Sequence, residues 1–345
     1  MPNTVILGTG FFVPPRIVTN QELTLLMDTS DEWIQERTGI RERRWIPERG
    51  TLGGASGETR GEELTGAKMA RFAAEMALEE AGRKARDIEA IVVATLSSDH
   101  SFPGTSAFLQ AELGLPGVPA LDIRTQCTGF IYGLSLVDAW IRMGQYRTVL
   151  LVGVEIQSTG LDLSSRGRDM AVLFGDGAGA VLLGAGAEDG KGILSTHLHA
   201  DGRHAKDLWC DVSSSYKHPR ISVADVEEGR IYPQMQGKEV FRHAVTRMPE
   251  VALEALTANG LHPKDVDLLI AHQANARISE GVRRKLSLPP EKIFNNIHRY
   301  GNTTAASIPI ALAEAVREGR LAAGDLLCLV AFGSGFTWGS ALVRW

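Results

Sequence analysis

A cysteine stands just before a long apolar segment of the chain. Cys127 lies in the stretch DIRTQCTGFIYGLSL, and apolar residues recur every three or four positions beyond it, which predicts a helix over residues 130–143. The free backbone N–H groups and the positive dipole end of a helix N-terminus favour a thiolate over a thiol, so Cys127 is a candidate nucleophile. A packed, inert cysteine is the open alternative. Cys210, in a polar segment, and Cys328, within an apolar run, are interpreted as structural.

A nucleophilic thiol needs a base or an electrostatic partner. His272 directly follows the apolar run 266–271, and the end of a buried strand is where a side chain enters a cleft. Asn302 lies in HRYGNTTAASIPIAL, a glycine-flanked turn before another helical segment, where a cap or turn role is the ordinary alternative. The glycine-rich stretch AFGSGFTWGSAL follows a further strand-like run, and its backbone N–H groups are suited to an oxyanion.

Strands and helices alternate along the chain and would position these residues. Strands are predicted at residues 4–7, 90–95, 148–154, 180–183, 266–271 and 326–332, and helices at 65–81, 106–113, 130–143, 240–258 and 307–318. Near-continuous apolar strands separated by helices indicate an α/β fold with sheets covered on both faces. EAG…DIEAIVVA and ANG…KDVDLLIA repeat one pattern, which predicts a duplicated fold with halves at residues 1–186 and 187–345.

Bulk composition excludes several classes of protein. The chain has 345 residues, a formal net charge of −5 and three widely spaced cysteines. These values argue against wholesale nucleic-acid binding and against a disulfide framework, and they favour a reducing cytoplasm. No apolar run is long enough for a membrane span, and the N-terminus lacks the pattern of a signal peptide, so no membrane partner is expected. The polar segments 47–63 and 204–230 are predicted to be surface excursions.

Several motifs together resemble the β-ketoacyl-acyl-carrier-protein synthase III family of thiolase-like condensing enzymes. They are TSDEWIQERTGIRERR, the cysteine stretch, LFGDGAGAVLL, STHLHADG, HQANAR, GNTTAAS and FGSGFTWGSAL, and they span nearly the whole chain. The resemblance implies an α/β thiolase-like fold of two duplicated βαβαβαββ-type halves in αβαβα layers. It also implies a catalytic triad of Cys127, His272 and Asn302.

The activity that this resemblance implies is a decarboxylating condensation. Cys127 accepts an acyl group from an acyl-CoA, malonyl-acyl-carrier protein then loses CO2, and the resulting enolate attacks the acyl group to give a β-ketoacyl-carrier protein, the first step of fatty-acid synthesis. His272 and Asn302 act as neutral donors to the enolate oxygen. Acyl-CoA and acyl carrier protein are substrates, and neither a cofactor nor a metal is expected.

Further residues take roles by the same resemblance. Gly333 and Ser334 belong to the oxyanion turn. Phe332 matches an aromatic gate, with an ordinary core aromatic as the alternative. Trp33 and Arg37 match residues that hold the CoA adenine. Phe241 and Arg168 are further candidates for CoA binding, with Arg166 as the alternative to Arg168.

The remaining expectations concern protein partners. Arg277 and Arg284 belong to a basic face suited to an acidic carrier protein, with a solvated charged face as the alternative for Arg284 and its neighbours. Phe102 matches a residue that crosses a homodimer interface to line the partner's acyl pocket.

Other readings of the sequence are weaker. FGDGAGA lacks the phosphate-loop pattern, FGSGF lacks the first glycine of a nucleophile elbow, and His197, His199 and His204 lack a helical metal-binding motif. The main rival is a relative that condenses two acyl-CoAs or transfers an acyl group in secondary metabolism. A catalytically silent acyl-binding protein is the rival of another class. Acyl-chain length and branching are left open.

Overall fold

Two β-sheets form the framework of the protein. The computed structural model describes residues 3–47, 63–186 and 190–345. The first sheet has the order β1-β7-β6-β4-β5, and the second has the order β11-β12-β13-β8. The bounds are β1 (Asn3–Phe12), β4 (Ala90–Ala94), β5 (Ala120–Ile123), β6 (Thr148–Glu155) and β7 (Gly177–Gly186), then β8 (Gly192–Ala200), β11 (Leu268–Ala271), β12 (Leu326–Gly333) and β13 (Thr337–Arg344).

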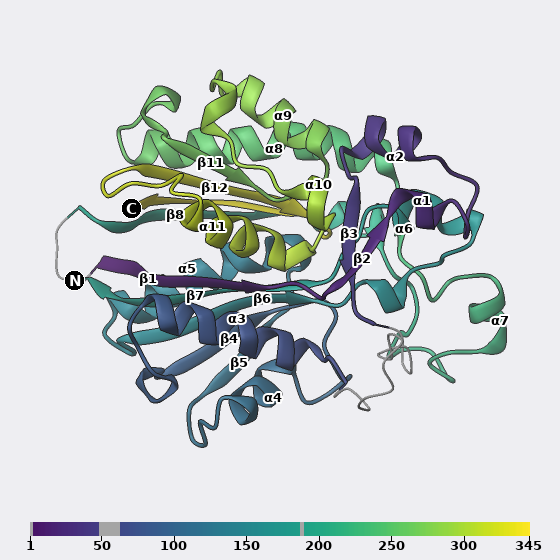
Figure 1. Ribbon diagram of the computed structural model, residues 1–345, viewed down its shortest axis with the longest axis horizontal. Helices are drawn as coiled ribbons and strands as arrows, with labels where there is room; N and C mark the ends of the chain where they lie inside the picture. The colour runs from purple at the N-terminus through teal and green to yellow at the C-terminus, as the bar shows by residue number, and fades with distance from the viewer. Residues whose placement is uncertain (1–2, 48–62, 187–189) are drawn as a thin grey trace.

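Helices complete five layers around these sheets (Figure 1). α3 (Gly66–Glu80) and α4 (Thr105–Glu112) cover the outer face of the first sheet. α5 (Gly129–Arg142) and α11 (Ser307–Arg317) lie between the two sheets and pack against both. α8 (Gly237–Ala258) and α9 (Ala276–Lys285) cover the second sheet. The layers are those of a thiolase-like fold, which confirms the predicted α/β class.

Small residues let helix and sheet approach closely in the first half. A β-carbon on Gly10 of β1 would lie 2.2 Å from the carbonyl oxygen of Ala73 in α3. The face of α3 that meets the sheet is rich in alanine, with Ala70, Ala73, Ala74 and Ala77 all buried. The glycines of β1 are therefore packing residues, and the strand continues through them to Phe12 rather than ending at residue 7 as predicted.

The two halves share one order of elements. The first runs β1-α3-β4-α4-β5-α5-β6-β7, which is the βαβαβαββ pattern. In the second, the third strand is reduced to a single parallel bridge between Leu269 and Ile293. The first sheet is built from residues 3–186 and the second from residues 192–344. The predicted division of the chain into halves 1–186 and 187–345 is consistent with these two sheets and remains a prediction.

Short elements gather at one end of the layers, on the right of Figure 1. They are β2 (Arg16–Thr19), α1 (Asn20–Leu23), α2 (Asp31–Thr38), β3 (Glu42–Trp45), α6 (Arg168–Ala171) and α7 (Val223–Glu227). The other short elements are β9 (Leu208–Trp209), β10 (Gln234–Met235) and α10 (Ile297–Tyr300). Most of the predicted excursion 47–63 falls at residues 48–62, outside the described residues.

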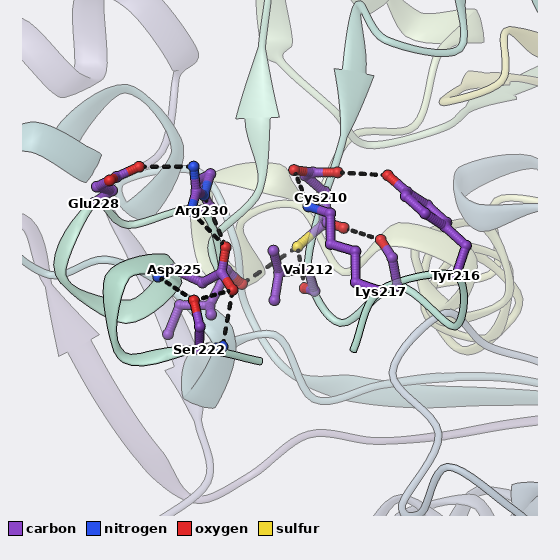
Figure 2. Close-up of polar contacts among 11 residues, drawn as sticks. Cys210, Val212, Tyr216, Lys217, Ser222, Asp225, Glu228 and Arg230 are labelled. Atoms are coloured by element: carbon purple, nitrogen blue, oxygen red, sulfur yellow. Dashed lines mark hydrogen bonds and ion pairs between the residues drawn. The ribbon is translucent and has the colours of Figure 1, made fainter. Parts of the chain in front are cut away.

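The excursion 204–230 is held by its own polar contacts (Figure 2). Ser222 and Asp225 form a capping box at the start of α7, and Arg230 pairs with Asp225 at 2.8 Å. Cys210 Sγ donates to the carbonyl oxygens of Val212 (3.0 Å) and Ile231 (3.3 Å), which ties the two ends of the excursion together. The segment is thus an ordered part of the fold.

Candidate active site

One cavity of about 890 Å³ contains the three residues of the expected triad. Cys127, His272 and Asn302 all line it, although they come from three distant parts of the sequence. Cys127 and Asn302 lie in turns that lead toward the central helices α5 and α11, whereas His272 follows the strand β11. Phe332, Gly333 and Ser334, at the end of β12 and just after it, line the same cavity.

Cys127 lies in a 3-10 turn, Gln126–Thr128, that leads directly into α5. The side chain is buried, and burial together with the nearby Glu155 carboxylate raises the pKa of its thiol to about 12. The backbone N–H groups of Cys127 and Ser334 face the sulfur and oppose this rise. The expectation of a thiolate in the resting protein is therefore wrong, because burial outweighs the donors of the helix end.

His272 follows β11, as predicted, and is almost fully buried. Burial lowers the pKa of its imidazole to about 3, so the ring is neutral near pH 7. Nδ1 hydrogen-bonds Ser307 Oγ at 2.6 Å, which leaves Nε2 for the cavity. A hydroxyl partner supports either tautomer, since it can donate to Nδ1 or accept from it.

Asn302 has the turn role that was its alternative interpretation. Its Oδ1 accepts a hydrogen bond from the backbone N–H of Thr304 at 2.8 Å. Its own backbone N–H donates to the carbonyl oxygen of Leu173 at 2.7 Å, which fixes the loop against the first half of the chain. With Oδ1 engaged, the amide N–H₂ group is the part of the side chain that is left for a ligand. The turn contact thus orients the amide.

The turn after β12 closes over the nucleophile. The Ser334 hydroxyl donates to the carbonyl oxygen of Leu208, so the turn is anchored to β9. Phe332 is buried, and its ring centre lies 4.8 Å from that of Phe336. Phe332 therefore belongs to the core and to the cavity wall at once.

Three of the expected CoA-binding residues, Trp33, Arg37 and Arg168, lie together outside the cavity lining. The guanidinium carbons of Arg37 and Arg168 each lie 4.7 Å from the centre of the Trp33 ring. Arg166, the alternative to Arg168, instead pairs with Asp162 at 2.6 Å and lies over the Tyr232 ring. The geometry therefore groups Arg168, rather than Arg166, with Trp33 and Arg37. These residues are not part of the lining of the Cys127 cavity.

The basic residues of α9 differ in whether they pair with a carboxylate or lie beside the cavity residue Phe241. Phe241 lines the cavity, and the Arg277 guanidinium carbon lies 5.5 Å from the centre of its ring. Arg283 and Arg284 both pair with Glu280 at 2.6 Å, and Arg283 is mostly buried. The predicted basic face is thus partly neutralised, and Arg277 is its residue nearest the cavity.

Phe102 is 84% exposed, and Leu121 on the edge strand β5 is 41% exposed. β5 is the last strand of its sheet, so one of its edges has no neighbouring strand among the described residues. His100 and Ser101, directly before Phe102, line the Cys127 cavity. An exposed phenylalanine thus stands beside the cavity.

The excursion 204–230 forms one wall of the cavity. Leu208, Trp209, Cys210, Val212, Ser213 and Arg220 line it. Arg124, which comes from the first half of the chain just before Cys127, also lines the cavity and acts electrostatically on the Cys210 thiol. The described lining residues include these two arginines and no aspartate or glutamate, which suits an anionic ligand.

Three residues of the site were not assigned from the sequence. Ser307 holds the imidazole of His272, Glu155 lies under Cys127, and Gln157 lines the cavity. Ser307 belongs to the motif GNTTAAS, which was its only signal. Glu155 gave no signal in the sequence, because a carboxylate at the end of an apolar strand is ordinarily interpreted as the polar boundary of that strand.

The clustered histidines have separate partners. His197 and His199 pair with Glu254 at 3.2 and 2.6 Å, whereas His204 pairs with Asp207 at 2.7 Å. In the described part of the chain, no group of three or more potential ligands is arranged to hold a metal ion. Nor does that part contain a helix with the length and apolar character needed to cross a membrane.

Comparison with known proteins defines the class of this chain. Residues 121–202 match the family model described as 3-oxoacyl-acyl-carrier-protein synthase III, and residues 256–345 match its C-terminal model. The β-ketoacyl-acyl-carrier-protein synthase III of Rhodospirillum rubrum is 47% identical over 349 aligned positions, covering 100% of both chains. That of Rhodospirillum centenum is 45% identical over 345 positions, covering 99% of both.

Solved structures agree with this assignment. The 3-oxoacyl-acyl-carrier-protein synthase III of Aquifex aeolicus is 41% identical with a TM-score of 0.87, and the alignment covers 99% of this chain and 100% of that one. The priming β-ketosynthase of the R1128 polyketide pathway is 31% identical with a TM-score of 0.85, over 99% and 96% of the two chains. The protein is a thiolase-like condensing enzyme, an acyltransferase. It belongs to the β-ketoacyl-acyl-carrier-protein synthase III family.

Proposed function

We propose that the protein condenses an acyl-CoA primer with malonyl-acyl-carrier protein, with loss of CO2, to begin fatty-acid synthesis. The observation that carries this proposal is the single cavity lined by Cys127, His272 and Asn302. The family membership of the protein supports the same reaction, since its relatives are named as β-ketoacyl-acyl-carrier-protein synthases III. No cofactor enters the reaction.

The first half-reaction moves the acyl group onto Cys127. Thiol and imidazole are both neutral at rest, because burial raises the pKa of Cys127 to about 12 and lowers that of His272 to about 3. Sulfur therefore loses its proton only as it attacks the thioester carbonyl, and that proton goes to the departing CoA sulfur. The backbone N–H groups of Cys127 and Ser334 receive the oxyanion, and CoA leaves with the proton.

The second half-reaction makes the new carbon–carbon bond. Malonyl thioester loses CO2 and becomes an enolate, whose oxygen accepts hydrogen bonds from His272 Nε2–H and from the Asn302 amide. Both donors are uncharged, so they stabilise the enolate without first giving up a proton. The enolate carbon attacks the acyl-Cys127 carbonyl, and collapse of the tetrahedral intermediate expels the cysteine thiolate, which takes a proton from water.

Substrate binding is assigned to residues in the cavity and to a second group outside its lining. Trp33, Arg37 and Arg168 would hold the nucleotide end of CoA, and Phe241 would contact its pantetheine arm. Arg277 is well placed to meet the acidic carrier protein, because it lies beside Phe241 at the cavity and has no carboxylate partner among the described residues. Arg284 would add to this surface, although Glu280 offsets its charge.

The protein is further proposed to be a cytoplasmic homodimer. The edge of β5, which has no neighbouring strand in the described part of the chain, and the exposed side chains of Phe102 and Leu121 supply a surface that a second copy would cover. Phe102 of each copy would then reach the partner's acyl pocket. The three free cysteines suit a reducing compartment.

Purified protein supplied with malonyl-carrier protein and a panel of acyl-CoAs tests the reaction. The proposal expects CO2 release and a β-ketoacyl-carrier protein extended by two carbons. Turnover without malonyl-carrier protein would instead favour the rival that joins two acyl-CoAs or transfers the acyl group elsewhere, a possibility raised by the likeness to a polyketide priming enzyme. Mass spectrometry of the intact protein after exposure to acyl-CoA addresses a silent acyl-binding protein, which would gain no thioester at Cys127.

A further inference from the structure

The side chain of Gln157 has a fixed orientation in the wall of the Cys127 cavity. Its Nε2 donates to Glu155 Oε2 at 3.1 Å and to Thr304 Oγ1 at 3.1 Å, so both amide hydrogens have partners. Gln157 lines the cavity and is only partly buried. Its Oε1 has no hydrogen-bond donor among the described residues, and this oxygen is therefore the polar atom left for a ligand.

Glu155 determines which end of the amide faces inward. Its carboxylate is completely buried and accepts backbone hydrogen bonds from Leu96, Ser97 and Ala305, at distances between 3.2 and 3.4 Å. The Ser97 hydroxyl adds another donor at 2.6 Å. In its ionised form Glu155 can only accept hydrogen bonds, so the group that Gln157 then turns toward it is N–H. A reversed amide would place a carbonyl oxygen against the carboxylate.

The same contacts tie Gln157 to the reacting groups. Thr304, the second acceptor of its amide, donates its own backbone N–H to Asn302 Oδ1. Glu155 lies close enough to Cys127 to act electrostatically on its thiol. Gln157 thus belongs to a hydrogen-bonded network that contacts Asn302 and acts electrostatically on Cys127, and its side chain lines their cavity.

We propose that Gln157 is a specificity-determining residue whose Oε1 accepts a hydrogen bond from a donor on the bound thioester. Two parts of such a ligand carry a donor: a hydroxyl on the acyl chain, and the amide N–H groups of the pantetheine arm. This inference rests on the proposed function, in that Cys127 takes its acyl group from an acyl-CoA. An acceptor in the wall of a binding cavity discriminates between ligands, because a ligand without the donor covers it and leaves it unpaired.

Rates of self-acylation at Cys127 test the inference. Intact-protein mass spectrometry would follow wild type and Gln157→Met, a replacement of similar shape without the acceptor. The donors are butyryl-CoA, 3-hydroxybutyryl-CoA and S-ethyl thiobutyrate, which has neither hydroxyl nor pantetheine. Thr159→Val is the matched control, because Thr159 lines the cavity outside the Glu155 network.

If the acyl hydroxyl is the donor, Gln157→Met loses about tenfold in rate with 3-hydroxybutyryl-CoA only. If the pantetheine amide is the donor, both CoA thioesters lose about tenfold and S-ethyl thiobutyrate is unaffected. Gln157→Leu should show the same selectivity as Gln157→Met. Wild-type rates with every donor, or an equal loss with all three, would overturn the inference. Failure of wild type to be acylated by any donor would instead contradict the proposed function.

Discussion

Gly333 lies against Cys127 so closely that a β-carbon on Gly333 would stand 2.7 Å from the Cys127 β-carbon and 3.2 Å from its sulfur. The end of β12 and the start of α5 therefore meet at the nucleophile without room for a side chain. This contact also brings the backbone N–H of Ser334 to the sulfur. The close approach is what builds the donor pair for the oxyanion.

Gly333→Ala should reduce self-acylation of Cys127 by about a hundredfold or more, because the new methyl group displaces the turn or the cysteine. Acylation rates from mass spectrometry measure the effect. Ser334→Ala is the matched control, since it removes only the hydroxyl contact to Leu208 and keeps the backbone N–H; we expect its rate to stay within a few-fold of wild type. Wild-type acylation by Gly333→Ala would show that the turn plays no part.

His272→Ala and Asn302→Ala should impair malonyl decarboxylation more than self-acylation, by about a hundredfold in the former step. The reason is that both side chains are assigned to the enolate oxygen. Release of CO2 and acylation of Cys127 are measured separately, with Cys127→Ser as the variant that should lose both acylation and condensation. Equal losses in the two half-reactions would mean that the assigned roles are wrong.

Ser307→Ala should lower kcat for condensation by roughly tenfold to a hundredfold, because the imidazole of His272 loses the partner that orients Nδ1. KM for malonyl-carrier protein should change little, since Ser307 lies behind His272 and away from the carrier protein. A change in KM with unchanged kcat would contradict this positioning role. The thermal midpoint of the variant serves as the control for folding.

Glu155→Gln should make Cys127 react faster with iodoacetamide at pH 8, by about threefold or more. The buried carboxylate raises the pKa of the thiol, so removing its charge lowers that pKa and increases the thiolate fraction at a given pH. Burial raises the pKa of Glu155 itself to about 7, so the two proteins should differ most above that pH.

Asp176→Asn is the control for this experiment. Asp176 is another buried carboxylate that accepts backbone hydrogen bonds, from Ile46, Gln157 and Ser158, but it is not among the groups that act on Cys127. Its substitution should leave the pH profile of alkylation in place. An unchanged profile in Glu155→Gln would show that the carboxylate does not influence the thiol.

Leu121→Lys should weaken the proposed dimer, because it places a charge on the exposed face of the edge strand β5. Light scattering coupled to size-exclusion chromatography would show a shift toward the monomer. Phe102→Ala should leave the dimer largely intact and change the preference for acyl-chain length, since its side chain is proposed to enter the partner's pocket. A monomeric wild type would rule out both expectations.

Periodic segments were the features that the sequence predicted best. The predicted helix 65–81 corresponds to α3 (Gly66–Glu80), with Thr65 as its N-cap, because a single apolar face of helical spacing already specifies that helix. The strand predicted at 180–183 extends over Gly177–Gly186, since its glycines allow the central helices to approach rather than ending the strand. β8 and β13 were not predicted, because they carry polar or small residues that only their pairing in the sheet explains.

The sequence by itself predicted the α/β class and proposed Cys127, His272 and Asn302 as candidate site residues, because apolar periodicity and short motifs are local properties of the chain. Only the tertiary structure decided the ionisation of Cys127, the support of His272 by Ser307 and the orientation of Gln157. Those properties depend on burial and on hydrogen bonds between segments as far apart as residues 155 and 305. Desolvation and hydrogen-bond geometry arise only when the chain has folded, so no local pattern encodes them.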